Sequence, residues 1–285
     1  MKKTLILLLV AAMLLSGASA LADWEDEADV GAWVLEGQPI EIDLDGDGAP
    51  ETVSIETMPD DFESFQRLRV VDAGGAEAVY EAEIIDGKDA WIYDLNGDGV
   101  QEIFLWGDVM SDDYYTWCLH YGSGRLAPVL FADTSRGDNG RGYFKQGYGA
   151  LESVDPAAGT VTLCGSQDVL GTYFMNRTLK LSEDGLFELA DDGLWVRDVD
   201  ASDPDLWEYA ALVPKAEIAL EDGEPLAPGE KFIVTGTDKE SVVTIVTEDG
   251  REGTISVSED YMRGWGLLLN DVSEEELFEF LPYAD

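Results

Sequence analysis

The stretch YDLNGDGVQEIFLWG, residues 93–107, sets Asp94, Asn96 and Asp98 on alternate residues of a glycine-containing loop, immediately before an apolar run that reads as a strand. The stretch IDLDGDGAPETVSIE, residues 42–56, repeats this pattern earlier in the chain. A plain polar turn needs one or two such residues, whereas here the whole set occurs twice in register. The pattern therefore predicts a loop with a specific chemical role that leads directly into a β-strand.

Oxygen-bearing side chains on alternate residues are typical ligands of a hard cation such as Ca²⁺, which takes six to eight oxygens at about 2.3–2.6 Å. In each loop a glycine at the sixth position allows the sharp turn that brings a backbone carbonyl back to the ion. The glutamate comes at position nine rather than twelve, so neither loop belongs to a helix–loop–helix EF-hand. Neither loop contains a lysine or arginine that would offset the acidic charge.

We therefore expect two Ca²⁺ sites, with solvated acidic turns as the alternative. Magnesium is disfavoured because it requires a near-octahedral shell with retained waters, and zinc because neither loop contains histidine or cysteine. The expected ligands of the first site are Asp43, Asp45, Asp47, the backbone carbonyl of Ala49, and Glu51. The expected ligands of the second site are Asp94, Asn96, Asp98, the backbone carbonyl of Val100, and Glu102.

Short apolar or alternating runs, separated by turns rich in glycine and aspartate, follow one another along most of the chain. Such runs are typical of β-strands, and turns such as AGG, GSG and EDG are typical of hairpins, so the sequence predicts an all-β, antiparallel domain. About four strand runs separate the two acidic loops, and a four-stranded sheet per repeat of roughly 40–50 residues is typical of a propeller blade. A partial propeller or a β-sandwich is the alternative, because no third copy of the loop follows near residue 145.

The segments DLDGDGAPETVSI and DLNGDGVQEIFLW resemble the calcium loops of FG-GAP/VCBS-type repeats, which occur in integrin-like β-propellers and in many secreted bacterial proteins. The resemblance covers residues 42–56 and 93–107 closely and the blade between them loosely. It implies a propeller-like domain with structural Ca²⁺ at the blade edges and with surface recognition elsewhere.

A change of pattern at ASDPDLWEYAAL, residues 201–212, divides the chain. Asp203 is placed to cap a short helix with Pro204 in its first turn. We therefore expect the FG-GAP/VCBS-like β domain to cover residues 23–212 and a smaller domain to cover residues 213–285.

The smaller domain resembles a bacterial SH3 domain over residues 226–257, through LAPGEKFIV, the EDG turn and the tripeptide Gly-Thr-Ile that follows the turn. Asp249 and Gly250 predict a tight hairpin between two alternating strands. Ser273 and Glu276 form the pattern of a capping box. They predict a short C-terminal helix that buries three apolar side chains, those of Leu277, Phe280 and Leu281.

The N-terminal segment, residues 1–22, has the lysines, short apolar core and small-residue end of a secretory signal peptide. We expect cleavage after Ala22 and release of a secreted, extracellular protein, since no lipid-modified cysteine follows the apolar core. The chain carries a formal net charge of −43, from 17 Lys+Arg against 60 Asp+Glu. Such a field repels nucleic acid and anionic lipid and attracts metal cations. With no second long apolar run, the protein is not expected to be embedded in a membrane.

Nucleophilic catalysis has little support in the sequence. His120 is the only histidine, and Cys118, two positions away on the same predicted strand, does not form a triad with it. We expect His120 to be a packed or strand-surface residue, and Cys118 and Cys164 to be either a disulfide or two buried free thiols. A glycan-acting hydrolase that uses carboxylates is the alternative, with a cleft near Asp112 and Asp113 in MSDDYYTW, whose aromatic residues otherwise anchor a loop in the core.

The sequence thus favours a secreted, calcium-binding and non-catalytic binding protein that acts at or near the bacterial surface. Its expected cofactor is Ca²⁺, and its expected partner is a cell-surface protein or a glycan such as peptidoglycan.

Overall fold

The computed structural model describes residues 31–59, 64–84, 87, 89–110, 113–133, 142–190, 193–238, 241–259 and 266–283. Strands make up 56% of the structure and helices 5%, and the sheets are antiparallel, which confirms the expected all-β class. The expected signal peptide, residues 1–22, lies outside the described residues. Within the described ranges, no helix has the length and apolar character of a membrane span.

The first acidic loop joins the first two strands of a four-stranded antiparallel meander, which we call the first sheet. Its strands are β2 (Ile40–Ile42), β3 (Glu51–Pro59), β4 (Ser64–Val71) and β5 (Glu77–Glu83). The runs TVSIE and RLRVV lie in β3 and β4, as the sequence predicts. The AGG turn joins β4 to β5 and contains Gly75 at a φ of 84°, a conformation that glycine adopts without strain.

The second acidic loop occupies the same place in a second meander, the second sheet. Its strands are β6 (Asp89–Tyr93), β7 (Glu102–Met110), β8 (Asp113–Gly122) and β9 (Arg125–Asp133). Three short strands extend this sheet: β1 (Ala32–Leu35) along β6, β10 (Gly142–Phe144) along β9, and β11 (Gln146–Tyr148) along β8. The two acidic loops therefore connect the first and second strands of successive meanders.

A third meander follows, the third sheet, within the strand-like pattern that the sequence shows along most of the chain. Its strands are β12 (Ala150–Asp155), β13 (Thr160–Asp168), β14 (Thr172–Leu181) and β15 (Leu186–Leu189). A short turn over residues 156–159 replaces the acidic loop, so the sequence offers no copy of the loop to mark this unit. β15 also pairs in parallel with β9, which links the second and third sheets.

The C-terminal part forms a further antiparallel sheet, the C-terminal sheet. Its strands are β16 (Trp195–Val196), β17 (Phe232–Thr237), β18 (Val242–Thr247), β19 (Glu252–Glu259), β20 (Leu267–Leu269) and β21 (Val272–Ser273). The predicted hairpin at Asp249 and Gly250 joins β18 to β19. β16 pairs with both β14 and β17, so backbone hydrogen bonding continues from the third sheet into the C-terminal sheet.

The helix predicted after Asp203 is α2 (Pro204–Tyr209). The carboxylate of Asp203 accepts a hydrogen bond from the backbone amide of Asp205 at 3.0 Å, and Pro204 stands in the first turn, as predicted. The local sequence was sufficient here because the cap and the turn involve only neighbouring residues.

The C-terminal helix, α3 (Glu274–Leu277), is shorter than the capping-box pattern suggests, and Ser273 stands at its N-cap without a side-chain capping hydrogen bond. Leu277 is buried and Leu281 packs against the core, as predicted. The prediction for Phe280 is wrong, because its side chain is 79% exposed. The helix ends at Leu277 and Phe278 is extended, and this change of direction buries Phe278 instead.

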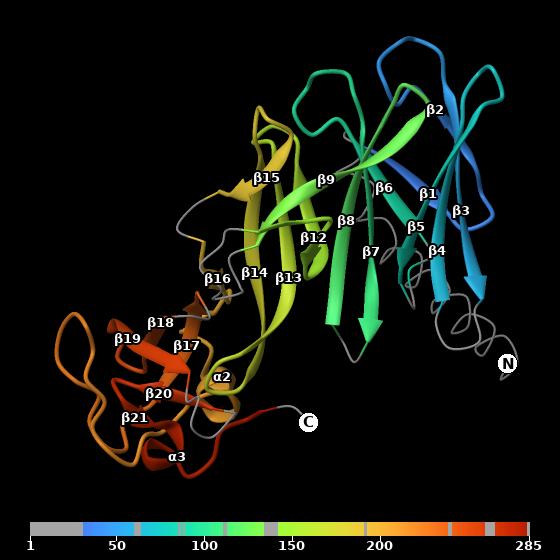
Figure 1. The fold of residues 1–285 in the computed structure, drawn as a ribbon. Coiled ribbons are helices and arrows are strands. Elements are labelled where there is room, and N and C mark those ends of the chain that lie inside the picture. The colour runs from blue at the N-terminus through green and yellow to red at the C-terminus, as the bar shows by residue number, and fades with distance from the viewer. Residues whose placement is uncertain are drawn as a thin grey trace, which may run out of the picture.

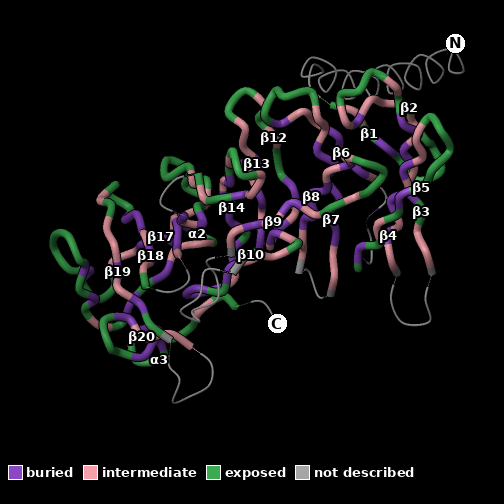
Figure 2. The backbone as a smooth tube through the Cα atoms, turned by 45° about the horizontal axis from the view of Figure 1, so that its top comes forward, coloured by how far each residue is buried: buried purple, intermediate pink, exposed green. Residues whose placement is uncertain are grey.

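The sheets follow one another in an open row, from the first sheet at the right of Figure 1 to the C-terminal sheet at the lower left. An apolar core fills the space between each sheet and the next. Ile103 and Leu105 of β7 belong to the core between the first and second sheets, whereas Phe104 belongs to the core between the second and third. The second sheet is thus covered on both faces, which explains the continuous apolar run of β7. Figure 2 shows buried backbone along the strands and exposed backbone in many of the connecting loops.

Candidate metal site

The backbone of the first loop is shaped by its own aspartates. Asp43 accepts hydrogen bonds from the amides of Gly46 at 2.9 Å and Gly48 at 2.8 Å, one through each carboxylate oxygen. Asp47 accepts a hydrogen bond from the amide of Ala49 at 2.7 Å. Gly46 and Gly48 have φ values of 72° and 88°, which glycine adopts without strain. These local bonds fold the loop back on itself, so that alternate side chains converge.

The second loop has the same framework. Asp94 accepts hydrogen bonds from the amides of Gly97 at 2.7 Å and Gly99 at 3.0 Å, and Asp98 accepts one from the amide of Val100 at 2.8 Å. Gly97 and Gly99 have φ values of 73° and 87°, close to those of their counterparts. The repeated sequence therefore produces a repeated loop geometry.

The ninth residue of each loop is a buried glutamate. Glu51 is 3% exposed and Glu102 is fully buried. The Oε2 atom of Glu51 accepts a hydrogen bond from the amide of Leu44 at 2.8 Å, and that of Glu102 accepts one from the amide of Leu95 at 2.7 Å. The side chains of both leucines are fully buried, Leu44 between the first and second sheets and Leu95 between the second and third. Each loop is thus held at its second residue by an apolar anchor and at its ninth by a carboxylate.

The first loop gathers carboxylates as a cation site requires. One carboxylate oxygen each from Asp43, Asp45 and Glu51 lies within 4.8 Å of the others, and no other group of this kind is found among the described residues. The Oδ1 atom of Asp45 is buried and has no hydrogen-bond partner. Two oxygens on opposite sides of one Ca²⁺ ion, each about 2.4 Å from it, would be roughly 4.8 Å apart, so this spacing is compatible with a metal ion, Ca²⁺ among others.

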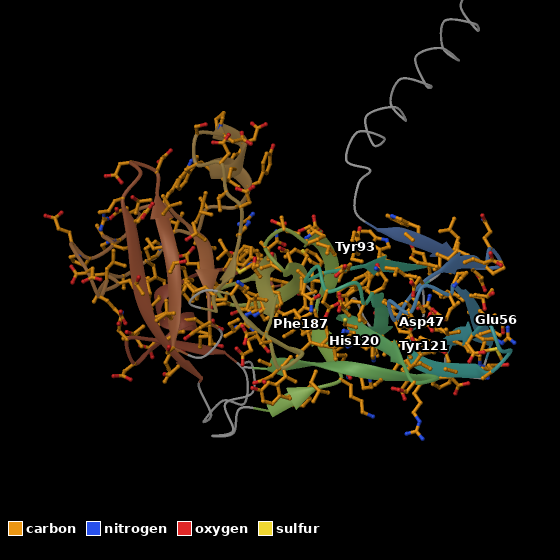
Figure 3. The ribbon with its side chains drawn as sticks, turned by 90° about the horizontal axis from the view of Figure 1, so that it is seen from above. Asp47, Glu56, Tyr93, His120, Tyr121 and Phe187 are labelled. Atoms are coloured by element: carbon orange, nitrogen blue, oxygen red, sulfur yellow. The ribbon has the colours of Figure 1, made fainter. Side chains whose placement is uncertain are left out.

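The electrostatics of the first loop also favour a cation. Burial raises the pKa of Glu51, the Leu44 amide lowers it, and the charges of Asp45, Asp47 and Asp43 raise it. Burial also raises the pKa of Tyr121, with further contributions from the loop carboxylates and Asp72. Figure 3 places Asp47 beside Tyr121, at the end of β8. Folding therefore concentrates negative charge that nothing within the loop compensates.

The second loop differs in two places. Asn96 stands where the first loop has Asp45, and its amide nitrogen donates a hydrogen bond to Oδ2 of Asp98 at 3.1 Å. Glu102 uses its second oxygen, Oε1, to bind Nε2 of His120 at 2.7 Å, and His120 lies opposite it on β8. Both oxygens of Glu102 therefore have protein partners. Sequence reasoning placed His120 on a strand but missed this contact, which depends on the register of β7 and β8.

The two loops touch each other. The amide of Gln101 donates a hydrogen bond to the carbonyl of Leu44 at 2.9 Å. A Cβ atom added to Gly46 would lie 2.9 Å from the carbonyl oxygen of Gly99, which leaves no room for a side chain. The loops therefore lie together at the same end of adjacent sheets, and a change in one is transmitted directly to the other.

The other chemical features that the sequence singled out do not form a site among the described residues. Cys118 and Cys164 are free thiols, and burial raises the pKa of both. Asp112 lies outside the described residues, as does the side chain of Asp113. Tyr115 and Trp117 from the same run pack against the core between the first and second sheets, which agrees with the alternative reading of these aromatics as anchors.

Comparison with known proteins gives no relative for this chain: no protein-family model, curated protein or solved structure matches it.

Proposed function

We propose that this chain is a secreted, calcium-stabilised and non-catalytic binding protein, and that its first loop holds a structural Ca²⁺ ion. The observation that carries the proposal is the convergence of Asp43, Asp45 and Glu51 within 4.8 Å, with an oxygen of Asp45 buried and unpartnered. Buried carboxylates are normally hydrogen-bonded or paired with a positive charge. A bound cation is therefore the best explanation for the buried, unpartnered oxygen of Asp45. Asp47 and the carbonyl of Ala49 would complete the shell.

We propose that the second loop, with Asp94, Asn96, Asp98, Val100 and Glu102, binds Ca²⁺ more weakly. Asn96 brings no charge, and His120 competes with an ion for Oε1 of Glu102. Affinity in loops of this kind depends on the number of charged ligands and on the rigidity of the site. The first loop offers more charged ligands than the second, because it has Asp45 where the second loop has Asn96.

The wider biological role is inferred from the sequence. The resemblance to FG-GAP/VCBS-type loops supports a propeller-like arrangement for residues 23–212, and the hairpin of β18 and β19 supports an SH3-like arrangement for residues 213–285. The leader-like residues 1–22 and the net charge of −43 support export and action at or near the bacterial surface, on a cell-surface protein or a glycan such as peptidoglycan. The only histidine, His120, is engaged with Glu102, which favours a binding role over nucleophilic catalysis.

Calorimetric titration of the mature protein with CaCl₂ tests the metal proposal. Wild type should give a heat of binding below 10 mM, since extracellular sites of this type bind at about 10⁻⁴–10⁻³ M. The variant Asp43→Ala/Asp45→Ala should lose the tighter binding event, and Asp94→Ala/Asp98→Ala should lose only the weaker one. The absence of any heat up to 10 mM, or an unchanged titration of the first variant, would refute the proposal.

A matched control removes the same charge elsewhere. Glu183 and Asp184 lie in the exposed hairpin between β14 and β15, so Glu183→Ala/Asp184→Ala changes the net charge by the same amount without touching either loop. This control should titrate like wild type. Sedimentation of the mature protein with intact bacterial cells, with calcium and with chelator, then tests the surface role separately from metal binding.

A further inference from the structure

A pocket of about 360 Å³ lies between the segment that follows α2 and the segment that follows α3. Residues 209–215 line one side of it, and Glu279, Phe280 and Pro282 line the other. Its volume falls within the range of about 300–1,000 Å³ that is typical of small-molecule sites. Neither acidic loop contributes a residue to the lining, so the pocket is separate from the proposed metal sites.

Two aromatic side chains at this pocket are the most exposed large apolar groups among the described residues. Tyr209 is 80% exposed and Phe280 is 79% exposed. Val213, in the same lining, is 47% exposed. Single exposed apolar side chains are common on protein surfaces, but here three of them, from two distant parts of the sequence, meet at one pocket. Such a cluster indicates a site that binds a partner with apolar groups.

The backbone on both sides of the pocket is held in place. Leu212 and Phe232 exchange backbone hydrogen bonds of 2.8 and 3.1 Å, which fix the first side against β17. The amide of Thr172 donates a hydrogen bond to the carbonyl of Pro282 at 3.1 Å, which fixes the second side against β14. Phe278, two residues before Phe280, is buried. The two exposed rings therefore project from anchored segments, and the pocket between them is formed before a ligand arrives.

The charged groups at the pocket favour a cation. Nζ of Lys215 donates a hydrogen bond to the carbonyl of Glu275 at 2.7 Å, so this ammonium group already has a partner. Glu279 forms no ion pair with any described residue. Glu208 and Glu276 add carboxylates in α2 and α3. Together with the formal net charge of −43, these groups repel an anionic ligand and attract a cationic one.

An organic ammonium ion matches both properties of the pocket. The face of an aromatic ring carries partial negative charge and attracts a cation, most strongly when the cation gives up its water. A quaternary ammonium ion has no N–H groups that bind water, and its methyl groups can pack against apolar side chains. A metal cation would instead require several oxygen ligands, and Glu279 supplies the only carboxylate of the lining.

We propose that this pocket binds a small quaternary ammonium ion, with its methyl groups against Tyr209 and Phe280 and its charge near the carboxylate of Glu279. This inference goes beyond the proposed function, because it assigns a ligand to a site that contains no calcium ligand. Binding of the organic cation and binding of calcium can therefore each fail without the other.

Calorimetric titration of the mature protein with choline and with dimethylbutanol tests the proposal. Dimethylbutanol has the same shape as choline, but a carbon atom replaces the charged nitrogen. Wild type should bind choline in the millimolar range and roughly five- to thirty-fold more tightly than the neutral analogue, as expected for a cation–π contact. The comparison on wild type separates attraction to the charge from simple apolar packing.

Variants at the pocket locate the site. Tyr209→Ala and Phe280→Ala should each weaken choline binding roughly five-fold or more, and both should fold because the side chains are exposed. Glu279→Gln should reduce the preference for choline over dimethylbutanol. As matched controls, Tyr143→Ala removes an exposed aromatic ring from β10 and Glu183→Gln removes a charge from the β14–β15 hairpin. Both controls should bind choline like wild type.

Three outcomes would overturn the proposal. The first is the absence of saturable heat with choline up to about 50 mM, well above the millimolar range of weak ligands. The second is equal binding of choline and dimethylbutanol by wild type. The third is unchanged choline binding by the double variant Tyr209→Ala/Phe280→Ala. The same double variant should titrate with CaCl₂ like wild type, which keeps this test separate from that of the metal sites.

Discussion

Replacement of Asp45 by asparagine isolates the charge that folding concentrates in the first loop. Without metal, a carboxylate oxygen of Asp45 lies within 4.8 Å of those of Asp43 and Glu51. Two unit charges at this distance repel by about 0.9 kcal/mol in a dielectric of 80 and by about 3.5 kcal/mol in a dielectric of 20. Asp45→Asn removes two such repulsions and keeps the side-chain shape. Because Asp43 and Asp45 are only partly buried, the high-dielectric value applies, and we expect the metal-free variant to be more stable than metal-free wild type by about 2 kcal/mol.

Calcium should offset this difference. At ten times the dissociation constant, a bound ion stabilises wild type by about 1.4 kcal/mol, and by about 2.7 kcal/mol at one hundred times. The variant has lost a charged ligand and should gain much less. For a chain of this size, 1 kcal/mol shifts the melting temperature by roughly 2–4 °C. Differential scanning calorimetry in EGTA and in 10 mM CaCl₂ should therefore give a higher melting temperature for Asp45→Asn without calcium and a larger calcium-induced rise for wild type.

The control for this experiment is Asp184→Asn, which removes one charge from an exposed hairpin and should leave the calcium-induced rise intact. A lower melting temperature for metal-free Asp45→Asn would show that the carboxylate stabilises the loop through its local contacts rather than strains it. A full calcium-induced rise in the variant would show that the ion binds elsewhere. Either result would refute the reasoning.

Three further predictions concern stability. Gly46 and Gly48 both have positive φ, but only a Cβ atom on Gly46 would meet the other loop. Gly46→Ala should therefore lower the free energy of unfolding, measured in urea, more than Gly48→Ala does. Equal losses would contradict the contact between the loops. Leu95→Ala should cost about 2–5 kcal/mol in the same assay because its side chain is fully buried, whereas a loss below about 1 kcal/mol would rule out its role as an anchor. Burial raises the pKa of Glu274 above its usual 4.5, so the carboxyl group binds a proton more tightly in the folded state than in the unfolded chain. The stability of wild type should therefore rise as the pH falls from neutrality toward the pKa of Glu274 in the folded state. Glu274→Gln should reduce this pH dependence in urea unfolding, and an identical pH profile would count against it.

The parts of the structure that depend on neighbouring residues could be predicted from the sequence. The strand runs and the turns at Gly75 and Gly250 lie where alternation and glycine placed them, and Asp203 caps α2. The backbone shape of the two acidic loops could also be predicted, because their aspartates accept hydrogen bonds from amides only a few residues away. In each case the interaction that decides the structure lies within a short segment, and the sequence displays it directly.

The parts that depend on distant residues could not be predicted. The parallel pairing of β15 with β9 joins segments far apart in the chain, so the strand pattern of the third sheet does not show it. The contact between Glu102 and His120 follows from strand register, which residue patterns alone do not set across a loop of unknown shape. Helical spacing places Phe280 in the core, but α3 ends at Leu277 and the side chain of Phe280 is exposed. These are tertiary effects, in which packing overrides the local pattern.

The position of the acidic loops also limits where metal can act. Both loops lie in the first two sheets, and the third sheet closes the same connection with a short turn that carries no convergent carboxylates. The C-terminal sheet is held by other means, since Tyr173 and Met175 of β14 share a core with Phe232 and Val234 of β17. The amide of Thr172 also donates a hydrogen bond to the carbonyl of Pro282 at 3.1 Å, which ties the chain end to the third sheet. Repulsion between carboxylates in a metal-free loop acts over a few ångströms and weakens sharply beyond about 8–10 Å in physiological salt. Loss of calcium should therefore loosen the junction between the first and second sheets while the C-terminal sheet keeps its structure.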